Sequence, residues 1–322
     1  MVKAIRMMGT GGPEVLRWIE VEPGLPGPGQ VLLRQQAAGV NFVDIYQRTG
    51  LYPVSPPNAL GVEGAGVVMA VGEMVSDLRP GDRVAWAGPP CGGYTEALVI
   101  DAHRLLKLPE GLSTEVAGSS LLRAITAQML LCRVAPRPAG SVVLLHAAAG
   151  GLGLLLAQWA QRLGWRVLGT VGSEAKADLA ARHGVEVIRP GADFVAEARR
   201  LTDGRGVDLV IEGIGGATLV QSLEALCPFG HLASIGQAGG IGAPPLDLSE
   251  LGPRRSVSLS RPSVFAYCSD PATYRPAARE SLDMLADGLA VTIGGRYPLA
   301  EAAEAHRALE GRRTTGSVVL IP

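Results

Sequence analysis

The sequence predicts two domains of different class: a β-rich domain of the partly open barrel type, and an α/β domain with a Rossmann-type, doubly wound parallel sheet. Three observations predict this. The chain has 322 residues, more than one hydrophobic core usually organises. Short strands and turn signals follow one another over residues 1–120. From residue 142 onward, apolar strands alternate with helical segments, which is the order of βαβ units.

Composition narrows the classes of function. The formal net charge is -1 and no block of like charge stands out, so we expect neither nucleic acid nor an anionic membrane as a partner. The first residues, MVKAIRM, alternate like a strand and lack the apolar region of a signal peptide. The four cysteines lie far apart in the chain, which favours a reduced, cytoplasmic protein.

The first 120 residues justify the β-rich domain. The turn clusters PGLPGPGQ (23–30) and RPGDRV (79–84) separate short strands. Strands are expected in VKAIRM (2–7), VLLRQQAAGV (31–40), GAGVVMAVG (64–72), DRVAWAG (82–88) and TEALVI (95–100).

The apolar stretch VVLLHAAAGGLGLLLAQWA (142–160) has the length of a membrane helix. However, Gly150, Gly151 and Gly153 would weaken a continuous helix. Its first part is typical of a buried parallel strand, and its second part is typical of a helix that ends at Gly164. We therefore predict a strand, a glycine-rich loop and a helix.

The segments after this loop repeat the same alternation. Helices are expected at 173–184, 193–202 and 216–227, the first of them with Ser173 as its N-cap and Gly184 at its end. Strands are expected at 166–170, 185–188, 206–214 and 230–236. Strands and helices in this order predict a parallel sheet rather than membrane helices.

The loop AAAGGLG (147–153) fits the dinucleotide fingerprint G-x-G-x-x-G, with Ala148, Gly150 and Gly153 in the three glycine positions. Gly150 would let the backbone approach a pyrophosphate, and Gly153 would let the helix lie close to the strand. Backbone N–H groups at the helix start, from Gly151 and Leu152 onward, would face the phosphates. The alternative is that these small residues only pack a turn.

The end of the second strand of this sheet indicates which nucleotide binds. NAD-binding sheets usually carry an acidic residue there. Here Ser173 lies 20 residues beyond Gly153, after Gly172 and before Lys176. A hydroxyl and an ammonium group suit a 2′-phosphate, so we predict NADPH rather than NADH. Glu174 argues against this unless it faces solvent, and Lys176 could be an ordinary surface lysine.

The C-terminal part mixes helices at 277–288 and 300–311 with a last strand at 316–322. A terminal strand after a nucleotide domain often returns to the first domain. His103, His183 and His306 have no motif context and are expected on the surface, whereas His146 is expected to be packed.

The combination resembles the medium-chain dehydrogenase/reductase superfamily and, within it, the zinc-free quinone oxidoreductase (zeta-crystallin-like) branch. The resemblance covers essentially the full chain. Its matching pieces are AAGVNFVDIYQRTGLYP (37–53), LGVEGAGVV (60–68), PGDRV (80–84), HAAAGGLG (146–153), SRPSVFAY (260–267) and YPLAEAAEAHRALEGRRTTGSVVLIP (297–322).

The resemblance implies a co-chaperonin-like barrel and the domain boundaries. The catalytic domain would comprise residues 1–121 and 266–322, and the dinucleotide-binding domain residues 122–265. Zinc alcohol dehydrogenases of this superfamily carry Gly-His-Glu where this chain has Gly61, Val62 and Glu63, so the metal-binding histidine is absent. A catalytic zinc needs about three protein ligands. No metal is therefore expected, and Glu63 is expected to be a turn or core carboxylate.

The resemblance also implies roles for residues of the substrate side. Asn41 would lie beside the nicotinamide and its ribose. Tyr46 and Tyr52 would line the substrate cleft, although both could instead belong to an amphipathic barrel surface. Thr126 would contact the carboxamide, in a motif that departs from the family pattern at Ala124.

On the cofactor side, the family pattern adds Ile235 after a strand of the nucleotide domain. For the 2′-phosphate it adds an arginine, here Arg312, and a tyrosine, whose place is taken by Pro190. Arg189 could compensate for that tyrosine. Arg261 would sit near the cleft mouth or serve the structure alone.

These features lead to one principal hypothesis and two alternatives. The principal hypothesis is an NADPH-dependent quinone oxidoreductase that transfers a hydride without a metal. The enzymatic alternative is an NADPH-dependent reductase of α,β-unsaturated aldehydes, ketones or thioesters. The non-enzymatic alternative is an NADPH-binding structural or RNA-associated protein. The resemblance further implies a homodimer.

Overall fold

The computed structural model describes residues 1–240, 242, 244–253 and 255–322. The chain divides into two compact units: unit 1 is Met1–Ile125 with Val264–Pro322, and unit 2 is Thr126–Ser263. The first boundary lies four residues beyond the expected residue 121, inside helix α3 (Leu121–Gln128). The second lies two residues before the expected one, at the start of α8 (Val264–Ser269). Because α3 continues across the first boundary, the sequence contains no loop there that could mark it.

Unit 1 is built mainly from strands. Its strands are β1 (Val2–Met7), β2 (Leu16–Val21), β3 (Gln30–Val40), β4 (Asn58–Ala59), β5 (Glu63–Val71), β6 (Arg83–Ala87), β7 (Ala97–Asp101), β8 (Leu106–Lys107), β15 (Ile293–Pro298) and β16 (Ser317–Ile321). Its helices, besides α3 and α8, are α1 (Phe42–Arg48), α2 (Thr114–Gly118), α9 (Pro271–Ala286) and α10 (Ala302–Glu310), with short 3-10 turns η1 (Pro13–Val15), η2 (Ala102–Arg104) and η5 (Leu299–Glu301).

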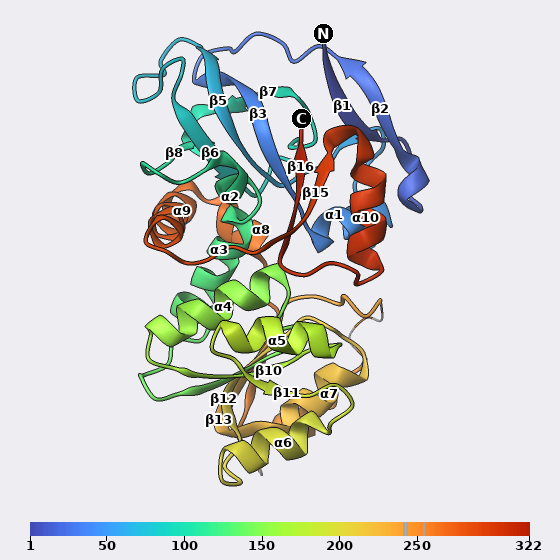
Figure 1. The fold of residues 1–322 in the computed structure, drawn as a ribbon, viewed down its shortest axis with the longest axis vertical. Helices are drawn as coiled ribbons and strands as arrows, with labels where there is room; N and C mark the ends of the chain where they lie inside the picture. Colours follow the sequence, from blue (N-terminus) through green and yellow to red (C-terminus); the bar gives the residue numbers. More distant parts are fainter. Residues whose placement is uncertain (241, 243, 254) are drawn as a thin grey trace. The chain divides into compact units, whose positions relative to one another are not determined.

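The larger sheet of unit 1 has the strand order β15-β16-β3-β5-β6-β8, with β7 also paired to β3. The long strand β3 accepts the C-terminal strand β16 antiparallel, with Val318 opposite Val40. The expected return of the last strand is therefore confirmed (Figure 1). Strand β15 was not expected, because Gly294 and Gly295 weaken its strand signal.

Alternating burial along the strands places one face of the larger sheet in a core. In β3, Val31 and Leu33 are completely buried, whereas Leu32 between them is only partly buried. They pack with Val84 and Trp86 of β6 in one cluster. Each such side chain stabilises the unit by about 2 kcal/mol when it leaves water.

Unit 2 contains a parallel sheet in the order β11-β10-β9-β12-β13-β14. The strands are β9 (Val142–Leu145), β10 (Arg166–Thr170), β11 (Glu186–Ile188), β12 (Val207–Glu212), β13 (Leu226–Ser234) and β14 (Ser258–Ser260). The helices are α4 (Gly151–Arg162), α5 (Glu174–Arg182), α6 (Phe194–Leu201) and α7 (Ala217–Glu224), with a π-helical turn η3 (Met129–Val134) and a 3-10 turn η4 (Leu248–Leu251).

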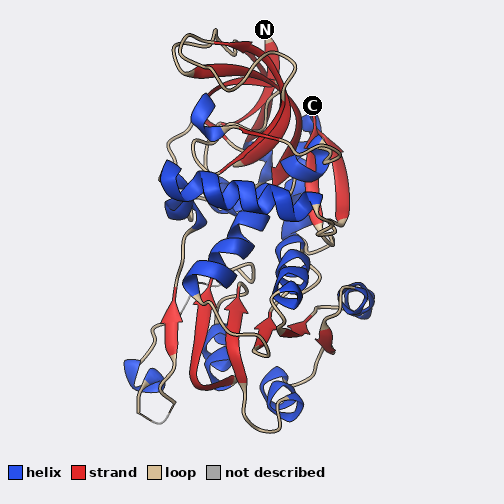
Figure 2. Cartoon of the chain, turned by 90° about the vertical axis from the view of Figure 1, so that its left-hand side faces the viewer, coloured by secondary structure: helices blue, strands red, loops and turns tan. Residues whose placement is uncertain are grey.

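This order is that of a doubly wound sheet, since the chain moves outward from β9 in both directions. Helices α4 and α5 cover one face of the sheet, and α6 and α7 cover the other (Figure 1). Figure 2 shows the strands as a layer with helices on both sides. The predicted fold class is thus confirmed, a barrel-like β unit plus a Rossmann unit.

The stretch 142–160 forms the strand β9, a loop and the helix α4, as expected. All of β9 is buried, which explains its unbroken run of apolar residues. Gly164 has φ of 76° and follows the end of α4, and Gly184 has φ of 75° and follows the end of α5. In the residues that the structure describes, no helix combines the length and apolar character needed to cross a membrane.

One expectation is wrong. His306 is not a surface residue but is completely buried. It lies on the face of α10 that includes Ala302 and Ala305, one helical turn apart, and this face packs into the core of unit 1. A single polar residue on an apolar helix face gives no sequence signal for burial.

Candidate active site

The glycine-rich loop joins β9 to α4 at the carboxyl edge of the parallel sheet. Gly150 is the N-cap of α4, with φ of -76° and ψ of 165°, and no side chain caps the helix there. The first-turn N–H groups of Gly151, Leu152 and Gly153 have no acceptor within an α-helix. They form the positive end of a helix, which favours a phosphate.

Close packing requires glycine at position 153. A Cβ atom there would lie 2.5 Å from the carbonyl oxygen of Ala147 and 2.8 Å from Cα of Ala148. At Gly150 the nearest atom to such a Cβ, the carbonyl oxygen of Ala147, is 3.2 Å away, so a side chain there would be tight but less obstructed than at Gly153. The close approach of α4 to the loop at Gly153 agrees with the packing role that the fingerprint predicts for this glycine.

The alanine in the first glycine position has a structural counterpart in the neighbouring strand. Ala148 is completely buried, and its N–H donates to the carbonyl oxygen of Thr170 at the end of β10. A Cβ on Gly169 of β10 would lie 2.6 Å from Cβ of Ala148. Glycine in the strand thus leaves the space that alanine in the loop occupies.

Two buried polar atoms lie unpaired at the same carboxyl edge. Glu212 ends β12 and Ser234 ends β13, and the two residues are register partners. Within the described residues, Oε2 of Glu212 and Oγ of Ser234 have no hydrogen-bond partner. The other oxygen of Glu212 accepts from the N–H groups of Ile214 (2.6 Å) and Gly215 (2.8 Å). Burial raises the pKa of Glu212, and those two N–H groups oppose the rise.

An edge with unpaired polar atoms beside an uncapped helix start fits a dinucleotide, which carries both phosphates and hydroxyls. Ile235, expected on the cofactor side, directly follows Ser234, and its N–H donates to the carbonyl oxygen of Glu212 at 2.7 Å. The described residues of unit 2 therefore fit a nucleotide at this edge.

Ser173 is the N-cap of α5, as predicted, and its Oγ accepts from the N–H of Lys176 at 3.4 Å. The serine hydroxyl keeps its own hydrogen to donate. Gly172 precedes it with open space around its Cβ position. The acidic residue of this turn, Glu174, forms an ion pair with Arg189. That pair offsets the negative charge of Glu174.

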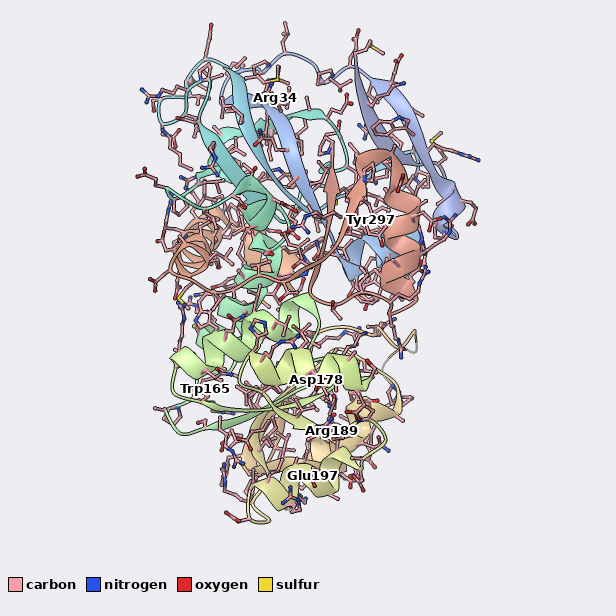
Figure 3. The ribbon with its side chains drawn as sticks, viewed as in Figure 1. Arg34, Trp165, Asp178, Arg189, Glu197 and Tyr297 are labelled. Carbon is pink, nitrogen blue, oxygen red and sulfur yellow. The ribbon has the colours of Figure 1, made fainter. Side chains whose placement is uncertain are left out.

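Arg189 follows β11 (Figure 3) and is exposed, as is Pro190 beside it. Arg189 thus pairs with the residue that directly follows Ser173. Arg261 donates to Oε1 of Gln237 at 3.3 Å, which is a structural contact within unit 2.

In unit 1, Asn41 is the N-cap of α1 and is nearly completely buried. Its backbone N–H donates to Oδ2 of Asp44 at 2.8 Å, and its side-chain Nδ2 donates to Oε1 of Glu63 at 2.8 Å. The latter carboxylate is completely buried at the start of β5 and also accepts from the N–H of Leu122 (2.8 Å) and Nη1 of Arg123 (3.2 Å). Glu63 is thus a core carboxylate, as expected.

A second buried carboxyl group, Asp44, lies on the other side of Asn41. It accepts from the N–H of Gly61 at 3.2 Å and from the hydroxyl of Tyr94 at 3.0 Å. Burial raises the pKa of Asp44 to about 7, and its hydrogen bonds oppose the rise. Nε2 of His306 lies 3.2 Å from the Tyr94 hydroxyl.

The two expected substrate tyrosines contact each other. The rings of Tyr46 and Tyr52 meet edge to face, with 5.2 Å between centroids, and Phe42 follows at 6.1 Å from Tyr46. Tyr46 is buried on α1, while Tyr52 is 40% exposed. Their arrangement is an aromatic cluster with one side chain open to solvent.

The remaining expected residues are dispersed. Thr126 is half-buried in α3. Arg312 is exposed in the turn after α10, with φ of 54°. His146 is packed, as expected: its ring nitrogens lie 2.9 Å from Oγ1 of Thr170 and 2.9 Å from Oγ of Ser222. Burial lowers the pKa of His146 to about 4, so it is neutral at physiological pH.

No group of three or more His, Cys, Asp or Glu side chains that could hold a metal ion occurs among the described residues. Three hydrogen-bond donors occupy the oxygens of Glu63, and one of them is a guanidinium.

Several residues of this arrangement carry no sequence signal. Arg123, Tyr94 and His306 come from three separate segments, and only the fold brings them to the network around Asn41, whereas Asp44 is local to it in the capping box of α1. Glu212 has a weak signal, since it is an acidic residue at the end of an otherwise apolar strand.

Two family models match the chain. Residues 27–110 match the model of the alcohol dehydrogenase GroES-like domain, and residues 151–283 match that of zinc-binding dehydrogenase. The quinone oxidoreductase of Pseudomonas aeruginosa is 41% identical over 100% of both chains. A 2-haloacrylate reductase of a Burkholderia species is 40% identical over 100% of this chain and 99% of the relative.

The solved structure of Escherichia coli quinone oxidoreductase complexed with NADPH is similar with a TM-score of 0.95 and 36% identity, over 99% of this chain and 100% of that one. The sequence similarity extends over the full length of the chain, and the solved structure matches the fold of both units. The chain belongs to the medium-chain dehydrogenase/reductase superfamily, in its quinone oxidoreductase branch.

Proposed function

We propose that this enzyme is an NADPH-dependent quinone oxidoreductase that transfers a hydride to a quinone without a metal. The observation that carries the proposal is the uncapped start of α4 behind Gly150 and Gly153. It supports a pyrophosphate-binding role for the N–H groups of Gly151, Leu152 and Gly153. The Escherichia coli relative complexed with NADPH supports the same cofactor.

Ser173, Lys176 and Arg312 are the proposed partners of the 2′-phosphate. The Ser173 hydroxyl and the Lys176 ammonium offer donors, and a phosphate prefers donors that carry charge. Glu174 does not oppose this role, because Arg189 pairs with it. Gly172 and Ile235 are proposed to border the nucleotide through their backbone.

NADPH supplies the hydride, and the protein supplies orientation and exclusion of water. Asn41 is proposed to hold the nicotinamide ribose, and Thr126 to contact the carboxamide. Tyr46 and Tyr52 are proposed to bind the flat acceptor by ring contacts, with the Tyr52 hydroxyl as a donor to a carbonyl oxygen. A quinone needs no strong general acid, because the oxyanion formed on hydride addition is delocalised.

A metal-free reaction is supported by the surroundings of Glu63. Val62 takes the place of the metal-binding histidine, and Glu63 is bound by Asn41, Leu122 and Arg123. A zinc ion would compete with these donors for the same oxygens.

We further propose that the enzyme acts in the cytoplasm as a homodimer, with no nucleic-acid partner. Widely spaced cysteines and a net charge of -1 support the location and the lack of nucleic-acid binding. The resemblance to the quinone oxidoreductase branch supports the homodimer. Light scattering of the purified protein and titration with an RNA probe at two salt concentrations test the oligomeric state and the RNA alternative.

The test of the principal proposal is NADPH oxidation by the purified protein, followed by nicotinamide absorbance. The acceptors are 1,4-benzoquinone and phenanthrenequinone, with NADH and heat-inactivated protein as controls. Rapid, saturable loss of NADPH with a quinone is the expected result. Equal rates with NADH and NADPH would contradict the proposal that Ser173 and Lys176 bind the 2′-phosphate. No quinone reduction would overturn the substrate assignment.

The second candidate is reduction of a conjugated carbonyl or acid. The relative at 40% identity, named a 2-haloacrylate reductase, favours it. An alkenal and 2-chloroacrylate belong in the same assay. Consumption of these acceptors alone would replace the quinone proposal with this one.

A further inference from the structure

Asn41 is held on three sides by groups that fix its orientation. Its backbone N–H donates to Asp44, and the carbonyl oxygen of the residue before it, Val40, accepts from Nη2 of Arg123 at 2.6 Å. Its side-chain nitrogen donates to Glu63 at 2.8 Å. An amide side chain ordinarily can turn over and exchange its oxygen and nitrogen. The contact with Glu63 and the capping box, in which the side chain accepts from the N–H of Asp44, both select the orientation with the nitrogen toward Glu63.

The carboxyl group of Glu63 is surrounded by donors only. Nδ2 of Asn41, the N–H of Leu122 and Nη1 of Arg123 all point to it, and the group is completely buried. An ionised carboxylate accepts and cannot donate, so it matches this environment. Burial raises the pKa of Glu63, while Arg123, Asn41 and Leu122 oppose the rise. The geometry is that of the charged form, paired with a guanidinium that is itself nearly buried.

Because the Glu63 carboxylate can only accept, the Asn41 amide cannot turn its oxygen toward it. With the oxygen turned toward Glu63, two acceptors would face each other in a buried site, which is costly. The amide oxygen of Asn41 therefore lies on the branch that points away from Glu63, where it accepts from the N–H of Asp44 in the capping box of α1. An amide oxygen can accept a second hydrogen bond, so this outward atom suits a hydroxyl donor such as a ribose hydroxyl and cannot polarise a carbonyl oxygen.

We propose that Glu63, held by Arg123, is a positioning residue that fixes the Asn41 amide with its oxygen outward and so makes Asn41 an acceptor for a cofactor hydroxyl. The inference rests on the proposed function for the identity of that hydroxyl. It assigns a role to the glutamate that is retained here beside Val62, where no metal-binding histidine remains.

The first variant is Glu63→Gln, which keeps the shape of the side chain. Its amide nitrogen faces either the N–H of Leu122, or Nδ2 of Asn41 together with Nη1 of Arg123. Both orientations set donor against donor and remove the negative charge that pairs with Arg123, so the contact that orients Asn41 is weakened. We expect the dissociation constant for NADPH to rise about tenfold, as for one lost hydrogen bond. We expect kcat/KM for the quinone to fall by about 100-fold, the effect of a misplaced reacting group.

The decisive variant exchanges donor and acceptor. In Asn41→Asp/Glu63→Gln, the amide nitrogen of position 63 can donate to the carboxylate of position 41, whose second oxygen is again an outward acceptor. The pair keeps the net charge of the original. We expect the double variant to recover most of the NADPH affinity and of kcat/KM, whereas Asn41→Asp alone places two carboxylates side by side and loses both.

The matched control is Glu310→Gln. It also removes a carboxylate paired with a buried arginine of unit 1, Arg48, but it has no contact with Asn41. We expect it to lower the melting temperature while the NADPH dissociation constant and kcat stay unchanged. The two variants are compared by their loss of activity for a given drop in melting temperature. If this ratio is the same in Glu63→Gln and in the control, Glu63 has a structural role only.

Binding of NADPH is measured by fluorescence titration, separately from turnover. If the wild type binds NADPH but reduces no quinone, the substrate proposal fails and the dissociation constants alone judge this inference. Unchanged NADPH affinity in Glu63→Gln overturns it. A double variant that is no better than Asn41→Asp, or that does not fold, also overturns it, because reversed partners should satisfy each other. If Glu63→Gln alone does not fold, the comparison of Asn41→Asp with the double variant decides.

Discussion

The hydroxyl of Tyr94 lies 3.2 Å from Nε2 of His306, and both side chains are completely buried. The same hydroxyl donates its single hydrogen to Asp44 at 3.0 Å. It must therefore accept from His306, which places the histidine proton on Nε2. Within the described residues, Nδ1 of His306 has no hydrogen-bond partner. The histidine is thus a neutral donor that has no means of stabilising a second proton.

Acid should therefore destabilise the protein partly through His306. Burial, and next the charge of Arg48, lower the pKa of His306 to about 3, whereas an unfolded chain binds the proton near pH 6.5. Between these values the unfolded state holds one more proton, so stability falls as pH falls. Replacing it by glutamine, His306→Gln, should lessen that dependence by about 1.4 kcal/mol per pH unit, measured by urea unfolding at pH 7, 6 and 5.

Other groups also shift in this pH range and set the background. His146 acts in the same direction, since its pKa is lowered to about 4, and so do His183 and His231, whose pKa values burial also lowers. Asp44 acts in the opposite direction, because its raised pKa favours the folded state at low pH. The matched control is His103→Gln, at an exposed position. An unchanged pH slope in His306→Gln, with a folded protein, would contradict the neutral buried assignment.

Gly153→Ala should damage the start of α4. The new methyl group would lie 2.5 Å from a backbone oxygen and 2.8 Å from a backbone carbon, atoms that cannot turn aside. We expect a loss of about 2 kcal/mol in stability, as for other overpacked sites, together with weakened NADPH binding. Gly172→Ala is the comparison, because nothing lies within 4 Å of its Cβ position. It should leave the melting temperature unchanged. Equal stability of the two variants would refute the packing argument.

Most of the fold was predictable because it depends on local patterns. The alternation that begins at β9 gave the parallel sheet, and capping residues such as Ser173 and Gly184 marked helix ends within one or two residues. β15 was not predictable, since two glycines mask a strand whose hydrogen bonds come from β16. The expected boundary at residue 121 and the division of the two units after Ile125 both fall in α3, a continuous helix that carries no local signal for a boundary.

The candidate site was predictable only where a motif is local in sequence. The glycine loop and the N-cap of α5 lie within about one turn of the elements they serve. The network around Asn41 could not be predicted, because Glu63, Tyr94, Arg123 and His306 are distant in the chain. Their buried polar character is set by contacts of the fold, and a sequence pattern carries no record of such contacts.

Lys176 should decide between the two nicotinamide cofactors. Replacing it by methionine, Lys176→Met, removes the ammonium group and keeps an apolar stem of similar length. If the ammonium binds the 2′-phosphate, KM for NADPH should rise about tenfold, the effect of one charge-assisted hydrogen bond, and KM for NADH should not change. Arg182→Met, at the exposed other end of α5, serves as the control. A parallel rise in KM for both cofactors would exclude phosphate recognition by Lys176.

Tyr52 tests the substrate side. The ring of Tyr52 packs edge to face on Tyr46 with 5.2 Å between centroids, and 40% of the residue is exposed. Tyr52→Phe keeps this ring contact and removes only the hydroxyl. If the hydroxyl donates to a carbonyl oxygen of the acceptor, kcat/KM for benzoquinone should fall about tenfold, as for one hydrogen bond, with unchanged melting temperature and NADPH affinity.

Tyr52→Leu separates the ring from the hydroxyl. It removes both, so it should lose the further benefit of an aromatic contact with a flat acceptor, about 1 kcal/mol. Steady-state kinetics with benzoquinone and with an aliphatic alkenal distinguish the two contributions, because only the flat ring of the quinone can stack. If Phe and Leu at this position behave alike with both acceptors, the ring does not contact the substrate. If both variants match the wild type, Tyr52 belongs to the barrel surface, and the acceptor is bound by other residues.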